Sequence, residues 1–226
     1  MTVYDVAAKL PSIDVLRDRC KALAVLDRII DDDPYYAYTR EWGDDEAALM
    51  SDGSGNEWAI VFTGHGAFIR VFDHESAMTP YRDPDHELWP GLLDGIPEVF
   101  RPHVEEPAFG DGAGQLVATA VLWRLTDDDA WRAGESITFP PSRGPYEHTG
   151  GPDGSGMLDI LFDDIVDRYV EFAEDYYEIE VDAAVVDHVV AHRPLTDAVV
   201  RALNPEATVA ELREAVTEVG YPIAAT

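Results

Sequence analysis

Four short runs of aromatic and β-branched residues, closely spaced between residues 35 and 72, constrain the fold of this chain most. Such residues favour strands, because their side chains pack well on a pleated surface. The turns between the runs are short and contain motifs such as Asp52-Gly53-Ser54-Gly55 and Gly64-His65-Gly66. Parallel strands need crossovers of about a dozen residues or more, so these turns predict antiparallel hairpins. The predicted strands are residues 35–42, 47–51, 57–63 and 67–72.

Further strands are predicted later in the chain. Residues 116–125 are nearly all apolar, which indicates a central strand with both faces covered. Residues 136–139 form a further predicted strand. The long segment of residues 73–114 is rich in proline and broken by single aromatic residues, so we expect an irregular excursion with short helical turns near residues 89–93 and 97–100. A loop this long in a compact domain is either functional or a sign that its elements are wrongly assigned.

The two ends of the chain have helical patterns. Apolar residues recur at helical spacing over residues 12–31, and Asp31-Asp32-Asp33-Pro34 ends that helix. Past residue 155 the predicted helices are 157–178, 181–191, 195–203 and 209–219, and Thr208 with Glu211 forms a capping box for the last. The fold class is therefore α+β, an antiparallel sheet with an N-terminal helix and a helical C-terminal third. We expect residues 1–226 to form a single domain, and the alternative is a sub-boundary near residue 150.

The charge of the chain restricts its partners. There are 45 acidic and 16 basic residues, and the formal net charge is −29. No basic stripe exists that could release counterions from phosphates, so binding to nucleic acid and to anionic membranes is disfavoured. Three interpretations stay open: a hydrated surface suited to a salty cytoplasm, an acidic face that docks a basic protein, or carboxylates that bind metal.

The acidic residues are partly arranged as a face on the predicted helix 157–178. One side of this helix has an apolar stripe, formed by Leu158, Leu161, Ile165, Tyr169, Phe172 and Tyr176. Another side has five acids, which are Asp163, Asp167, Glu171, Glu174 and Glu178. We interpret these five as residues that bind a basic protein partner.

The irregular excursion offers a second set of partner-binding residues. Trp89 lies in Glu87-Leu88-Trp89-Pro90-Gly91, among acids and turn residues, and Tyr81 precedes it. Exposed aromatic residues among charges have the composition of a protein-binding hot spot. The alternative is that these rings are tucked onto the sheet as ordinary core residues.

Histidines and acids in the same region suggest a metal site as an alternative. The candidate ligands are His65, His74, Glu75 and His86. Imidazole and carboxylate groups bind zinc or iron, and a histidine beside a carboxylate can act as a general base, so this alternative is a metal-dependent hydrolase holding a divalent metal ion. The spacing matches no established metal motif. The structural alternative is that Asp73, Glu75 and Ser76 brace the loop after strand 67–72.

No catalytic motif is recognised in the chain. The glycine-rich segments 110–114 and 150–156 lack the lysine of a P-loop, and a Gly-x-Ser-x-Gly elbow is absent. The pattern favours a protein that is not an enzyme and has no cofactor. The single cysteine, Cys20, cannot form a disulfide within the chain, and residues 1–10 lack the apolar run of a secretory signal. We therefore expect a cytoplasmic protein that does not span a membrane.

Several segments carry a resemblance to a known group of proteins. They are Phe72-Asp73-His74-Glu75-Ser76, Pro80-Tyr81, Pro90-Gly91-Leu92-Leu93-Asp94-Gly95-Ile96-Pro97, Trp123-Arg124, Trp131 and Pro152-Asp153-Gly154-Ser155. Through these segments, much of residues 57–160 resembles an uncharacterised family of small acidic bacterial intracellular proteins. The family has no established activity, so the resemblance implies no catalytic residue. By analogy of class, some acidic α+β proteins of this type act as immunity proteins against secreted toxins.

These observations lead to one main hypothesis and two alternatives. The main hypothesis is a non-enzymatic binding or immunity-type protein that takes a basic protein partner on its acidic helix and its excursion. The first alternative is the metal-dependent hydrolase at residues 65–86. The second is a structural subunit whose acidity is salt adaptation alone.

Overall fold

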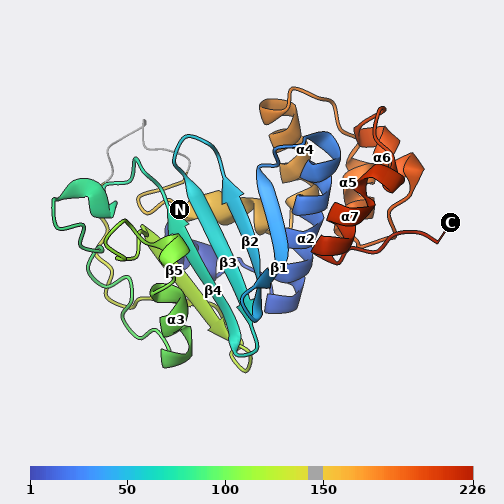
Figure 1. Cartoon of the computed structure of the whole chain (residues 1–226). Coiled ribbons are helices and arrows are strands. Elements are labelled where there is room, and N and C mark those ends of the chain that lie inside the picture. Colours follow the sequence, from blue (N-terminus) through green and yellow to red (C-terminus); the bar gives the residue numbers. More distant parts are fainter. Residues whose placement is uncertain (142–149, 226) are drawn as a thin grey trace. The chain divides into compact units, whose positions relative to one another are not determined.

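The computed structural model describes residues 1–141 and 150–225, and these residues form two compact units. Unit 1 consists of Met1–Ile13 and Leu49–Asp159, and unit 2 of Asp14–Ala48 and Ile160–Thr226. The strands follow one another in the sheet in chain order, β1-β2-β3-β4-β5-β6. Figure 1 labels β1 to β5. The α+β class, with its antiparallel sheet, N-terminal helix and helical C-terminal third, is confirmed.

Unit 1 is built on a hairpin of β3 (Glu57–Thr63) and β4 (Gly66–Phe72), followed by β5 (Ala120–Leu125) and the short β6 (Arg132–Ala133). The pairs β3–β4, β4–β5 and β5–β6 are all antiparallel, as the short turns predict. Every residue of β4 is buried, so both of its faces are covered. Gly66 has a φ of 149°, and a side chain there would collide with the Arg124 backbone of β5, which explains the glycine.

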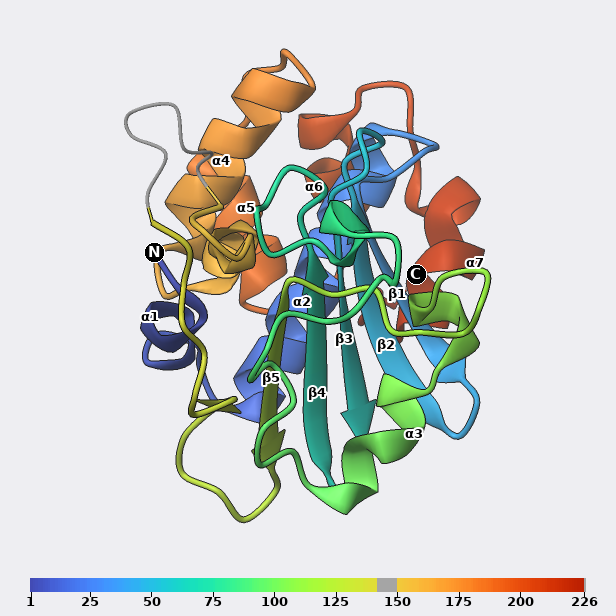
Figure 2. The same ribbon diagram turned by 90° about the vertical axis from the view of Figure 1, so that its left-hand side faces the viewer.

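The excursion of residues 73–114 covers one face of β3, β4 and β5 (Figure 2). It contains the short helices η1 (Pro80–Arg82), η2 (Glu98–Phe100), α3 (Arg101–Val104) and η3 (Pro107–Phe109). Phe100 and His103 pack their rings 6.3 and 5.9 Å from Phe68 of β4. The excursion is therefore part of the core of unit 1.

A buried polar network ties the start of the excursion to the glycine-rich segment 150–156. The Asp73 Oδ1 atom accepts from the backbone N–H groups of Glu75 (2.9 Å) and Ser76 (3.2 Å). The Ser76 hydroxyl donates to the Pro152 carbonyl (2.6 Å), and Asp153 Oδ2 accepts from the N–H of Val3 in α1 (Val3–Ala7; 2.7 Å). The predicted bracing role of Asp73 and Ser76 is confirmed.

Unit 2 contains α2 (Ile13–Ile30), which begins at the last residue of unit 1, and β1 (Tyr36–Trp42). Its other helices are α4 (Ile165–Tyr176), α5 (Ala183–Val190), α6 (Asp197–Leu203) and α7 (Val209–Val219). The strand β2 (Asp45–Ser51) spans the point where the chain passes into unit 1. Helix α5 packs against α4 and α6, and α7 packs against β1 (Figure 1). Thr208 is the N-cap of α7, as predicted, because its side-chain oxygen accepts from the Glu211 N–H. The Glu211 carboxylate accepts from the Thr208 hydroxyl (2.7 Å), which differs from the bond to the backbone N–H in a capping box.

Three predicted elements are absent from the structure or differ from it by more than two residues at an end. The strand predicted from residue 116 begins at Ala120, because Leu116 instead forms a bridge with Gly110 of the excursion. Residues 136–139 form no strand, and the Thr138 carbonyl accepts from the Trp89 indole instead. The helix predicted over 157–178 is divided into η4 (Ser155–Leu161) and α4, because Asp164 takes the non-helical N-cap conformation (φ −90°, ψ 23°).

Candidate functional site

Helix α4 and its flanks carry exposed carboxylates that we call the acidic face. Its residues are the five predicted ones, Asp163, Asp167, Glu171, Glu174 and Glu178, and all five are exposed. Asp163 pairs with Arg19 of α2 at 2.8 Å. Within the part of the chain that the structure describes, the other four have no ion-pair partner. Asp163 precedes the helix and Glu178 follows it, so only three of the five lie on α4 itself.

The apolar stripe of α4 ends in a group of rings, which we call the aromatic patch, in which Tyr176 is exposed and the other rings are half-buried. It consists of Tyr35, Phe172, Tyr176 and Tyr177. Tyr176 stacks on Phe172 with ring centroids 5.4 Å apart, and Tyr35 contacts Tyr176 at 4.8 Å and Phe172 at 4.9 Å. Tyr176 nevertheless keeps 51% of its surface exposed. The assignment of Tyr176 to the core stripe was therefore wrong, because helical spacing identifies a face but not what covers it.

Acids lie close to these rings in the sequence. Asp31-Asp32-Asp33 precedes Tyr35 by two residues, and Glu174-Asp175 precedes Tyr176. All five of these acids are exposed. The contact between Tyr35 and Tyr176 therefore brings two acidic segments that are far apart in the chain to the same surface of unit 2.

Beneath the aromatic patch lies a buried carboxylate, Asp27 of α2. Its Oδ1 accepts from the Tyr169 hydroxyl (2.7 Å), and its Oδ2 accepts from the Tyr36 backbone N–H (2.8 Å). Burial raises the pKa of Asp27 to about 6, although these hydrogen bonds oppose the rise. Asp27 holds together α2, the start of β1 and α4. Sequence reasoning missed it, and the signal was an acid among Leu23, Leu26 and Ile30 on an apolar helix face.

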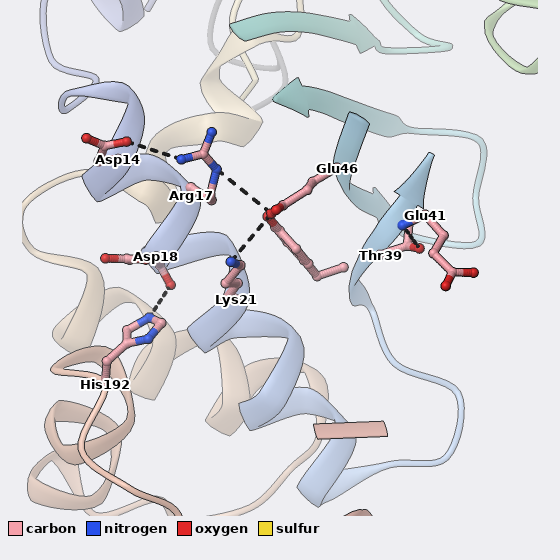
Figure 3. Close-up of polar contacts among 9 residues, drawn as sticks. Asp14, Arg17, Asp18, Lys21, Thr39, Glu41, Glu46 and His192 are labelled. Carbon is pink, nitrogen blue, oxygen red and sulfur yellow. Dashed lines mark hydrogen bonds and ion pairs between the residues drawn. The ribbon is translucent and has the colours of Figure 1, made fainter. Parts of the chain in front are cut away.

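A second cluster in unit 2 gathers cations on one carboxylate, that of Glu46 in β2 (Figure 3). Lys21 Nζ lies 3.4 Å and Arg17 Nε 3.9 Å from Glu46 Oε2, and the Tyr38 hydroxyl donates to the same oxygen. Desolvation raises the pKa of Glu46, but the Tyr38 hydroxyl and the two cations outweigh it and leave the pKa lowered. These cations serve internal pairs, so they do not offset the exposed acids of α4.

The predicted aromatic residues of the excursion belong to unit 1. Tyr81 is 51% exposed and makes edge contacts with Phe72 and His86. The Trp89 indole N–H donates to the Thr138 carbonyl (2.9 Å), and the Arg82 guanidinium lies over its ring at 5.2 Å. Tyr81 therefore presents an open surface, whereas the Trp89 ring is partly covered.

The predicted metal ligands are not brought together. His65 lies in the turn between β3 and β4, and His74 follows the opposite end of β4, so a seven-residue strand separates them. That strand is about 23 Å long at about 3.3 Å per residue. His74 Nδ1 contacts Asn56 Oδ1 (2.8 Å), and His86 Nδ1 contacts Asp111 Oδ2 (2.9 Å). In residues 1–141 and 150–225, no three His, Cys, Asp or Glu side chains are placed to hold a metal ion.

Comparison of the chain with the known protein families, with curated proteins and with solved structures finds no match. The resemblance of residues 57–160 to small acidic bacterial proteins stays a prediction. Among the described helices, none has the length and apolar character needed to cross a membrane.

Proposed function

We propose that this protein is a non-enzymatic binding protein that takes a basic protein partner on the acidic face of α4. The observation that supports the proposal is the set of four exposed acids, Asp167, Glu171, Glu174 and Glu178, without an ion-pair partner in the described residues. The opposite side of the helix is anchored by buried residues such as Ile165 and Tyr169, which hold the face in place.

The spacing of these acids makes a cationic partner favourable. Glu171 lies four residues after Asp167, and Glu174 three residues after Glu171, so their side chains are neighbours on the helix surface. Like charges at these spacings each destabilise the helix by roughly 0.2–0.5 kcal/mol. A basic partner relieves this repulsion on binding. The total charge of −29 also attracts such a partner from a distance and speeds association.

An immunity-type role is one form of this function. Binding would then cover the active surface of a basic toxin and block its activity. An acidic protein fits this role, because proteins that act on nucleic acids present basic surfaces to phosphates.

The test removes two charges from α4 and two from a matched helix. Glu171→Gln with Glu174→Gln removes two charges from the acidic face, and Glu214→Gln with Glu218→Gln neutralises two exposed glutamates, four residues apart, on α7. Each tagged variant is used to capture proteins from the source organism at its own ionic strength. The captured partner is then purified and its affinity for each variant is measured.

We expect a basic protein to be captured by the wild type and by the α7 variant. Its affinity for the α4 variant should fall roughly three- to thirtyfold, since each exposed charge contributes about 0.3–1 kcal/mol. Equal affinity for both variants, or capture of no basic protein by the wild type, would refute the proposal.

A further inference from the structure

We propose that the aromatic patch and the acids beside it recognise arginine side chains of the partner. This inference rests on the proposed function and adds a chemical specificity to it. The site consists of the exposed Tyr176 ring, its neighbours Tyr35 and Phe172, and the acids next to them in the sequence, Asp31–Asp33, Glu174 and Asp175. Of these acids, Asp32 also pairs with Arg28 at 3.8 Å.

The Tyr176 ring has the properties of a platform for a cation. It is held by the stacked Phe172 (interplanar angle 11°), while half of its own surface is open. The cations Lys21, Arg82 and Arg168 each lie over other aromatic rings of the chain. Within the residues that the structure describes, no cation lies over Tyr176. Phe172 covers one face of the ring, and Tyr35 and Tyr177 make edge contacts with it at 4.8 and 4.9 Å. The part of the ring surface that stays open can attract a cation of a partner.

Carboxylates close to the ring in the sequence favour the same ligand. Glu174 and Asp175 precede Tyr176 by two residues and one residue, on other sides of the helix, and have no ion-pair partner among the described residues. A guanidinium group is planar, is weakly hydrated and carries five donors, so it can stack on a ring and donate to carboxylates at the same time. A lysine ammonium group is compact and strongly hydrated, and it matches this combination less well.

The patch is also pre-organised, which lowers the entropy cost of binding. Asp27 fixes the backbone at Tyr36 and the hydroxyl of Tyr169, one residue from Tyr35 and one helical turn from Phe172. Tyrosine side chains have few rotatable bonds, and protein-binding hot spots are enriched in such rings. A rigid aromatic centre with an acidic rim is therefore complementary to an arginine-bearing surface.

The experiment compares oligo-arginine with oligo-lysine peptides of equal length and charge. Their affinities for the full-length protein are measured by titration calorimetry at about 0.15 M salt, where long-range attraction is screened. We expect the wild type to bind the arginine peptide more tightly. Tyr176→Ala should lower the affinity for the arginine peptide by roughly two- to fivefold and leave the affinity for the lysine peptide unchanged. Tyr176→Phe keeps the ring and should behave like the wild type.

Two further variants separate this inference from the proposed function. Tyr81→Ala removes an equally exposed tyrosine of unit 1, and loss of the arginine preference in that variant instead of Tyr176→Ala would overturn the assignment. The variant Glu171→Gln with Glu174→Gln should have a lower affinity for both peptides. If it does so while the wild type binds both peptides equally, arginine recognition is refuted and the proposed function stands. If the wild type binds neither peptide, both are refuted.

Discussion

Asp27 is the residue on which the aromatic patch depends most. It is fully buried, and it bonds to groups on two different elements, Tyr36 at the start of β1 and Tyr169 in α4. Most buried acids are costly because ionisation in a low-dielectric interior is disfavoured. Through these two hydrogen bonds, the Asp27 carboxylate links the internal packing of unit 2 to its proposed binding surface.

The pKa of Asp27 leads to a pH-dependent stability. The folded state holds the proton more tightly, with a pKa of about 6 against 3.8. The contribution of Asp27 to the free energy of unfolding is therefore fully present below pH 3.8 and is lost as the pH rises through about 6. A shift of about two pKa units corresponds to about 3 kcal/mol.

The substitution Asp27→Asn tests this. The amide cannot ionise, its oxygen can accept from the Tyr36 N–H, and its NH₂ group can donate to the Tyr169 oxygen. The free energy of unfolding of the variant minus that of the wild type should be larger at high pH than at low pH, by up to about 3 kcal/mol. Urea unfolding of both proteins on either side of the transition measures the difference. A difference independent of pH would show that Asp27 does not titrate in this range.

At the scale of elements, the end of α4 is strained at a proposed binding residue. Glu178 follows the C-cap residue Tyr177 and has a φ of 55°, the left-handed conformation that usually belongs to glycine. A side chain in this conformation costs about 1–2 kcal/mol. The turn it forms ends α4 just after the exposed Tyr176, so the strain lies beside the aromatic patch.

Glycine at position 178 should relieve this strain. We expect Glu178→Gly to raise the free energy of unfolding by up to about 1 kcal/mol, after the extra flexibility of glycine in the unfolded chain is subtracted. Glu180→Gly removes the same charge at a position without a positive φ and is the matched control. Thermal or urea unfolding compares the two. If the Glu178→Gly variant is no more stable than the control, the backbone at Glu178 is not strained.

At the scale of the whole molecule, the net charge of −29 is the main electrostatic feature. Self-repulsion destabilises a compact, highly charged chain, and salt screens it. We expect the free energy of unfolding to rise as salt increases from about 0.05 to about 0.5 M, where the Debye length falls well below about 10 Å. The same increase should weaken capture of a basic partner, because that attraction is screened as well. Stability that is flat over this range would show that the acids do not repel appreciably in the folded state.

Local pattern predicted the elements of this protein better than the site. The hairpin of β3 and β4, with bounds within one residue of the prediction, follows from the aromatic and β-branched residues and the turn chemistry that lie within the segment itself. Adjacent residues likewise predict helix α7 and its N-cap, Thr208. The start of β5 was not, because Leu116 pairs with Gly110, and that pairing depends on the path of the excursion.

The sequence by itself determined which residues favour strands or helices, which faces are apolar, and that the surface is strongly acidic. These properties depend on near neighbours in the chain. Only the tertiary structure decided that Tyr35 meets Phe172 and Tyr176, that Asp27 lies buried beneath them, and that the predicted histidine ligands lie apart. The physical reason is that periodicity defines a face, whereas the packing of distant segments decides whether that face is covered.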